Sequence, residues 1–114
     1  MLSSPERPVI VCLCGSARFW RQFQKSYLDE TLAGRIVLTI ATVPGGDEAL
    51  FAPFSPAERT RVTGMLEALH RHKIDLADEV LILNVGGYIG PGTARERAYA
   101  ERRGKRVRYL GPPA

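Results

Sequence analysis

Residues 8–16 read Pro8-Val9-Ile10-Val11-Cys12-Leu13-Cys14-Gly15-Ser16, an apolar run that ends in a glycine and a serine. A short, continuously apolar run with several β-branched residues is typical of a strand that is covered on both faces, as in a parallel sheet. The glycine and serine that follow indicate a turn. We therefore predict a buried strand over residues 9–14.

The rest of the chain alternates between helical and strand patterns. Aromatic and leucine side chains recur every three or four residues over 19–32, which predicts a helix. Ser55 and Pro56 suit the start of a longer helix that runs to residue 78, and a further helix is predicted over 93–103. Strands are predicted over 35–41, 79–84 and 106–110, and the proline- and glycine-rich segment 42–56 is predicted to be a long loop with room for one short turn.

Strands that alternate with helices imply an α/β domain with a parallel sheet. Right-handed crossovers restrict its topology, and we predict a single three-layer, flavodoxin- or Rossmann-like domain over residues 1–114. Its four parallel strands would lie in the order 2-1-3-4. Ligands of such sheets bind beyond the carboxyl ends of the strands, at the switch in strand order. The predicted site is therefore formed by the loops 15–18 and 85–92.

Composition excludes several classes of protein. Of the 114 residues, 45% are hydrophobic and 25% charged, which is typical of a globular domain and not of a disordered chain. No apolar run reaches the roughly 20 residues that span a membrane, and the first residues lack the apolar core of a signal peptide, so we expect a cytoplasmic protein without a membrane partner. The small core and an aromatic-rich first helix predict a homodimer or higher homo-oligomer.

The formal net charge of +4 suits an anionic ligand. The arginines gather between residues 95 and 108, where a solvated helix face explains them better than nucleic-acid binding does. A nucleoside or nucleotide phosphate is a smaller anion that would also account for the excess. We therefore expect a small-molecule partner and not nucleic acid.

The first loop, Gly15-Ser16-Ala17-Arg18, combines groups that can bind phosphate. Glycine permits close approach of the backbone, serine offers a hydroxyl, and the guanidinium can form paired hydrogen bonds. A plain strand-to-helix turn with Ser16 as the helix N-cap explains the same residues equally well.

The second loop contains four glycines within seven residues, at positions 86, 87, 90 and 92. That is more than a turn requires, and close approach of the backbone to a ligand is the better explanation. Candidate ligand-binding residues in and beside this loop are Asn84, Gly87, Tyr88, Gly92 and Thr93.

Glu96 lies one turn into the helix that follows, where its carboxylate would face the predicted site as a nucleophile or a base. An ordinary acid favoured by the helix dipole is the alternative. Cys12 and Cys14 would point to the same face of their strand. No Cys or His cluster with zinc spacing accompanies them, so we expect buried free thiols, no metal and no cofactor.

A longer stretch, from Leu76 to Ala100 and then Gly104 to Val107, resembles the nucleoside 2-deoxyribosyltransferase family, including the related 2'-deoxynucleoside 5'-monophosphate N-glycosidases. The resemblance is carried by Gly92-Thr93-Ala94-Arg95-Glu96-Arg97-Ala98-Tyr99-Ala100, which matches the Gly-Thr-Ala-x-Glu-x-x-Tyr-Ala helix of that family. The first loop is similar to the Gly-Ser-x-Arg phosphate-side loop of the glycosidases.

The resemblance implies cleavage of an N-glycosidic bond. Glu96 would attack the anomeric carbon, the base would leave, and water or a second base would release the glycosyl-enzyme. Gly15, Ser16 and Arg18, with the N–H groups near Gly92 and Thr93, would hold a 5'-phosphate, and Tyr88 would pack on the sugar or base.

Two positions depart from the family pattern. Gly90 stands where the transferases have an acid six residues before the nucleophile, and His70 stands where they have an aspartate. His70 is therefore a candidate acid–base residue, with a helix-surface histidine as the alternative. The family's transferases also extend beyond the last predicted strand with a C-terminal segment that this sequence lacks, so we expect hydrolysis or binding alone rather than base transfer. These departures keep a second function open, a non-catalytic nucleotide-binding or nucleotide-sensing module.

Overall fold

The sheet of the computed structural model, which describes residues 7–112, has four parallel strands in the order β2-β1-β3-β4. The strands are β1 (Ile10–Cys14), β2 (Ile36–Leu38), β3 (Glu79–Ile82) and β4 (Arg106–Tyr109). The helices are α1 (Trp20–Leu32), α2 (Gly46–Phe51), α3 (Pro56–Leu76) and α4 (Pro91–Arg102), with 3-10 turns η1 (Ala17–Phe19) and η2 (Val85–Gly87). The predicted fold class and strand order are confirmed.

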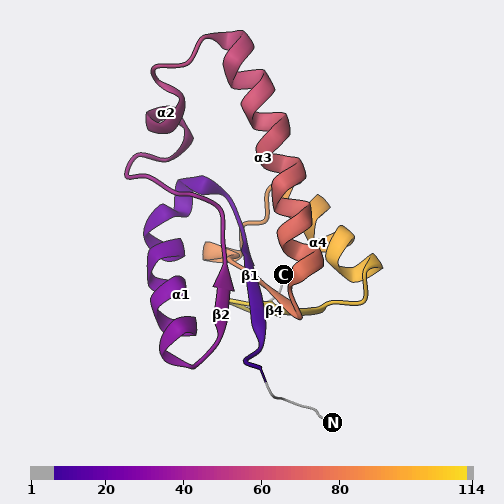
Figure 1. The fold of residues 1–114 in the computed structure, drawn as a ribbon. Helices are drawn as coiled ribbons and strands as arrows, with labels where there is room; N and C mark the ends of the chain where they lie inside the picture. The colour runs from indigo at the N-terminus through magenta and orange to yellow at the C-terminus, as the bar shows by residue number, and fades with distance from the viewer. Residues whose placement is uncertain (1–6, 113–114) are drawn as a thin grey trace.

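Helices cover both faces of the sheet and make three layers (Figure 1). On one face, Phe23 of α1 packs against alternate residues of the two central strands, Val11, Leu13 and Leu81. On the other face, Ile74 of α3 and Ala100 of α4 pack against Cys12, Cys14, Val80 and Ile82. Both central strands are buried on both faces, which explains why their residues 10–14 and 80–82 are continuously apolar.

The structure corrects three predicted boundaries. The second strand covers three residues and not 35–41, because β2 is an edge strand that pairs with β1 only from Ile36 to Leu38. The first helix begins with the turn η1 and not directly at Phe19. The predicted loop 42–56 contains the six-residue helix α2, whose first turn carries Asp47 and Glu48, where acids are favoured by the helix dipole.

The first half of α3 rises beyond the carboxyl edge of the sheet, with α2 beside it (Figure 1). An edge-to-face contact between Phe51 and Phe54, at 5.3 Å between ring centroids, and the Arg59 guanidinium 4.9 Å from the Phe51 ring hold α2 against the start of α3. The two helices thereby form a wall above the strand ends. Within residues 7–112, no helix combines the length and the apolar character that crossing a bilayer requires.

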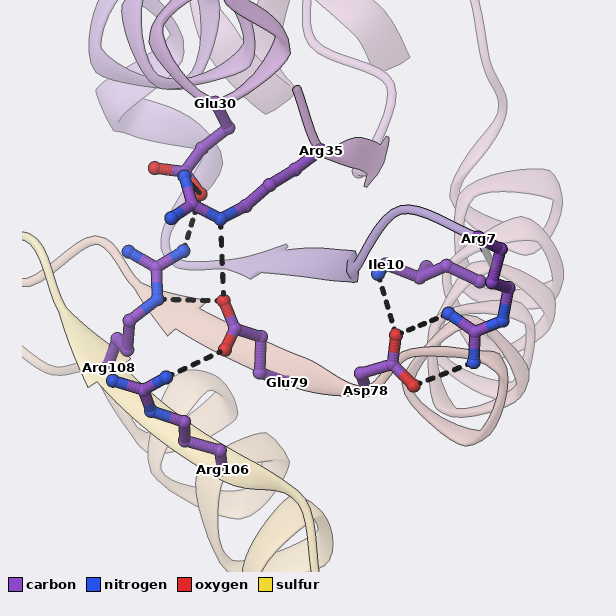
Figure 2. Close-up of polar contacts among 8 residues, drawn as sticks. All are labelled: Arg7, Ile10, Glu30, Arg35, Asp78, Glu79, Arg106 and Arg108. Atoms are coloured by element: carbon purple, nitrogen blue, oxygen red, sulfur yellow. Dashed lines mark hydrogen bonds and ion pairs between the residues drawn. The ribbon is translucent and has the colours of Figure 1, made fainter. Parts of the chain in front are cut away.

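A network of ion pairs fills the α1 side of the sheet at the start of β3 and β4 (Figure 2). The buried Glu79 accepts a hydrogen bond from Arg108 Nε at 2.9 Å and has Arg106 at 3.6 Å. Arg108 also bonds to Glu30 of α1, and Arg35 lies 3.3 Å from the same carboxylate. Two buried carboxylates are thus compensated by arginines, which is the condition for placing such charges out of water.

The neighbouring Asp78 joins the chain before β1 to the start of β3 (Figure 2). Its carboxylate accepts hydrogen bonds from Arg7 at 2.6 and 2.8 Å and from the Ile10 N–H at 2.8 Å. The bond from Arg7 and the bond from Ile10 lower the pKa of Asp78 to about 2. The aspartate that precedes the third strand therefore has a structural role.

Candidate functional site

A cavity of about 520 Å³ opens where β1 and β3 end, as predicted from the switch in strand order. The wall of α2 and α3 closes one side of it with apolar side chains such as Phe51 and Leu66. Its polar lining includes residues of both predicted loops and the two candidate catalytic residues: Gly15, Ser16, Tyr88, Gly92, Thr93, His70 and Glu96. The charged residues Asp47, Glu67 and Lys73 also line it. A cleft of this size, apolar with a few convergent polar groups, suits a small ligand.

Glu96 and His70 meet at the floor of this cavity. Glu96 projects from the second turn of α4 with 25% of its side chain exposed, and its Oε1 lies 3.8 Å from Nε2 of His70, which is 3% exposed. Burial raises the pKa of Glu96, and the nearby His70 opposes that shift. The histidine is therefore a buried neighbour of the candidate nucleophile and not a helix-surface residue.

The two thiols of β1 lie directly behind His70. Its Nε2 is 3.4 Å from Cys14 Sγ and 3.8 Å from Cys12 Sγ, and both cysteines are free and fully buried. Hydrogen bonding by Cys14 lowers the pKa of the Cys12 thiol to about 6, whereas the same bond and burial raise that of Cys14. Burial lowers the pKa of His70, but the Cys12 bond and the charges of Cys12 and Glu96 outweigh it, so the pKa is raised.

The two loops touch each other at the mouth of the cavity through Arg18 and Tyr88. The guanidinium lies 4.4 Å from the centre of the Tyr88 ring and donates a hydrogen bond to its hydroxyl at 3.2 Å. Phe19 adds an edge-to-face contact with Tyr88 at 5.9 Å. Ser16 accepts the Arg18 N–H at 3.4 Å and so caps η1, as one of the two interpretations of this loop expects.

Tyr88 also lies directly against Gly90. A Cβ at position 90 would lie 2.8 Å from the Tyr88 hydroxyl oxygen and 3.3 Å from two ring atoms. The tyrosine thus occupies the space next to the backbone into which an acidic side chain at position 90 would extend.

Three predicted binding residues do not line the cavity: Arg18, which lies against Tyr88, and Asn84 and Gly87. Asn84 is 1% exposed, and its side chain binds the backbone of the last described residues, accepting the Gly111 N–H at 2.8 Å and donating to the Pro112 carbonyl at 2.9 Å. Gly87 has a φ of +82°, which favours glycine, and an added Cβ would meet nothing within 4 Å. We therefore assign Asn84 and Gly87 structural roles at the end of β3.

The arginines between residues 95 and 108 divide into two groups. Arg103 pairs with Asp75 at 3.0 Å, Arg97 donates to the Tyr109 hydroxyl at 3.4 Å, and Arg106 and Arg108 belong to the network of Figure 2. Arg95 and Arg102 instead line a hollow of about 290 Å³ between α3 and α4, which Glu96 also lines. The cluster therefore does not form one continuous basic surface.

Sequence reasoning did not identify the apolar wall of the cavity or the contact between the thiols and His70. The wall could not be recognised because α2 and the first half of α3 meet only through tertiary packing. A scan against models of known protein families finds no match for this chain, and a search of curated proteins finds none either. The proposed activity therefore depends on the motif residues and on the geometry of the cavity.

Proposed function

We propose that the protein cleaves the N-glycosidic bond of a nucleoside or nucleoside 5'-monophosphate, with Glu96 as the nucleophile. The observation that carries the proposal is a partly exposed carboxylate on the floor of a nucleotide-sized cavity that two glycine-containing loops line. A carboxylate oxygen attacks the anomeric carbon, and the carbon–nitrogen bond breaks with its electron pair leaving on the base. Water then hydrolyses the ester on Glu96 and releases the sugar.

The surroundings of Glu96 suit this role. Partial burial removes water from the carboxylate, and the imidazole of His70 lies 3.8 Å from it and opposes the rise of its pKa. The first loop and the N-terminus of α4 offer a hydroxyl, a guanidinium and free N–H groups near Gly92 and Thr93 for a 5'-phosphate. Arg18 would exchange its contact with Tyr88 for the phosphate, and the freed ring would then pack on the sugar or base.

The test is to incubate the protein with a panel of nucleosides and their 5'-monophosphates and to measure the free base that is released by chromatography. Glu96→Gln should lower the rate by at least about 10³-fold, because the carboxylate nucleophile is lost. Glu67→Gln is the matched control, since Glu67 also lines the cavity but is exposed to solvent. Equal base release by the wild-type protein and Glu96→Gln would refute the proposal.

A non-catalytic nucleotide-binding module is the second candidate function. It is favoured by Tyr88, which fills the space beside Gly90 where the related transferases have an acid. In that case calorimetry would detect binding of a nucleoside monophosphate without any release of base, and Glu96→Gln would leave the affinity nearly unchanged.

We also propose that the protein forms a homodimer. Met65 and Leu69 of α3 are 50% and 44% exposed, and burial of such apolar side chains against a second copy would be favourable. A monomeric mass in sedimentation at micromolar concentration would contradict the proposal.

A further inference from the structure

Four side-chain atoms of metal-ligand type converge on the cavity floor. Cys12 and Cys14 come from β1, His70 from α3 and Glu96 from α4. The ligand atoms of the two cysteines and the histidine all lie within 4.8 Å of one another, and all three residues are buried. Around His70 Nε2, the separations are 3.4 Å to Cys14 Sγ, 3.8 Å to Cys12 Sγ and 3.8 Å to Glu96 Oε1.

Hydrogen bonding accounts for only part of this arrangement, in which Cys12 Sγ also lies 3.9 Å from the Leu13 carbonyl oxygen, to which it can donate. Nε2 either donates its one hydrogen or accepts one hydrogen from a thiol, depending on the tautomer, so it bonds to one of its three neighbours at a time. The separation of 3.8 Å from the Glu96 oxygen is also longer than the roughly 2.7–3.2 Å of an N–H···O bond. Three groups that can each carry negative charge therefore surround one imidazole nitrogen, and at most one of them is bonded to it.

A tetrahedral metal ion would account for these separations. Zinc binds thiolate sulfur at about 2.3 Å and imidazole nitrogen at about 2.0–2.1 Å, so tetrahedral angles place the sulfur and nitrogen about 3.6 Å apart. The two observed separations, 3.4 and 3.8 Å, lie on either side of that value. A carboxylate oxygen would lie about 3.4 Å from the nitrogen. Glu96 Oε1 now lies 3.8 Å from it and outside the 4.8 Å cluster of the other three ligand atoms, so the Glu96 side chain has to move towards the thiols to complete the site.

We propose that Cys12, Cys14 and His70, completed by Glu96, bind a Zn²⁺ ion at the floor of the cavity. Two thiolates, an imidazole and a carboxylate suit zinc and not magnesium or calcium, which prefer oxygen ligands. The ion can enter from the cavity, because His70 and Glu96 both line it.

One feature of the site limits its affinity for zinc. Nδ1 of His70 is buried and finds no partner among residues 7–112. Zinc-binding histidines usually donate this second N–H to an acceptor, and loss of that support weakens metal binding by roughly 10–100-fold. We therefore expect weaker binding than in a structural zinc site, with the ion removable by a chelator.

Zinc binding and the proposed glycosidase reaction exclude each other, because a metal-bound Glu96 cannot attack a sugar. The two proposals can nevertheless be refuted independently of each other. Metal binding is measured directly on the protein, whereas base release is measured after treatment with a chelator.

The experiment uses the full chain, treated with EDTA and then dialysed against Zn²⁺. Elemental analysis should find about one zinc per chain, and the Cys12→Ala/Cys14→Ala and His70→Ala variants should retain less than a tenth of it. His72→Ala is the matched control, since His72 is exposed on the same helix and should leave the zinc content unchanged.

The same protein loaded with Co²⁺ reports the ligands without any variant. Two thiolates should give a sulfur-to-cobalt charge-transfer band in the near ultraviolet, together with the intense visible absorption of tetrahedral cobalt. If the variants fail to fold, as circular dichroism would show, this spectrum of the wild-type protein alone shows whether the two thiolates bind the metal. Absence of the charge-transfer band, or equal zinc in the wild-type protein and a folded double-cysteine variant, would overturn the proposal.

Discussion

A Gly90→Ala substitution tests whether Tyr88 occupies the space beside Gly90. The backbone at Gly90 is extended, with φ −74° and ψ 171°, so alanine is compatible with it. Its Cβ would lie 2.8 Å from the Tyr88 hydroxyl oxygen, which forces the tyrosine to move. The substitution should therefore act through Tyr88 and not through the backbone.

The size of the effect follows from the contacts that Tyr88 would lose. The edge-to-face contact with Phe19 and the cation–π contact with Arg18 each contribute up to about 1 kcal/mol, and the hydrogen bond from Arg18 contributes a similar amount. Tyr88 is 40% exposed, so its displaced ring can rotate into solvent, and this rotation recovers part of the lost free energy. We expect a coupling free energy of about 1–2 kcal/mol between positions 88 and 90.

The assay is a double-mutant cycle in urea, with Gly90→Ala measured in the wild-type protein and in Tyr88→Ala. Alanine is a poorer helix N-cap than glycine, but that cost is equal in both backgrounds and cancels. A coupling of this size corresponds to a difference of roughly 0.5–1 M between the midpoint shifts. Gly64→Ala, where an added Cβ meets nothing within 4 Å, serves as the uncoupled control. A coupling below about 0.5 kcal/mol would refute the assigned position of Tyr88.

Three further predictions concern single contacts. Arg108→Met should destabilise the protein by about 2–3 kcal/mol, because Glu30 and Glu79 both lose their hydrogen-bonded arginine and keep only longer arginine contacts. Arg106→Met, at a side chain that is 74% exposed, should cost less than about 1 kcal/mol in the same urea assay. Asp78 has a lower pKa in the folded protein than its usual value of about 3.9, so its stabilisation is present above that pH and is lost as the pH falls towards 2. Asp78→Asn should accordingly be less stable than the wild-type protein at pH 7, with the difference disappearing near pH 2 in thermal unfolding. Arg18→Ala should raise KM for nucleoside monophosphates by about 10–100-fold and leave KM for nucleosides nearly unchanged, since it removes only a charge-assisted phosphate contact.

The strand order was predictable because the apolar runs of β1 and β3 require burial on both faces. Only central strands of a parallel sheet meet that requirement, which places 9–14 and 79–84 side by side at the centre of the sheet. The edge strand β2 was predicted too long, since an apolar sequence does not show where the neighbouring strand stops pairing with it. The helix α2 was missed because its glycines and nearby prolines are equally typical of a loop.

The cavity was predictable in position but not in composition. Strand order alone placed it at the loops 15–18 and 85–92, and Glu96 followed from its distance to the glycine loop. Asn84 was misassigned because a polar residue at the end of β3 can point either into the cavity or towards the chain after β4. That choice depends on where Gly111 and Pro112 pass, which the local sequence does not show.

The alternation of side chains along β1 determines which groups lie at the cavity floor. Alternate residues of a strand point to opposite faces, so Cys12 and Cys14 share one face and Val11 and Leu13 share the other. Had β1 been shifted by one residue, the thiols would face Phe23 of α1, and His70 would lie against aliphatic side chains. In the observed register, the thiols face α3 and α4, which supply His70 and Glu96. Both of these residues lie at least 56 positions further along the chain than the cysteines. A search for metal ligands by local spacing cannot find such a site, because strand parity and two crossovers, not a short motif, bring its members together.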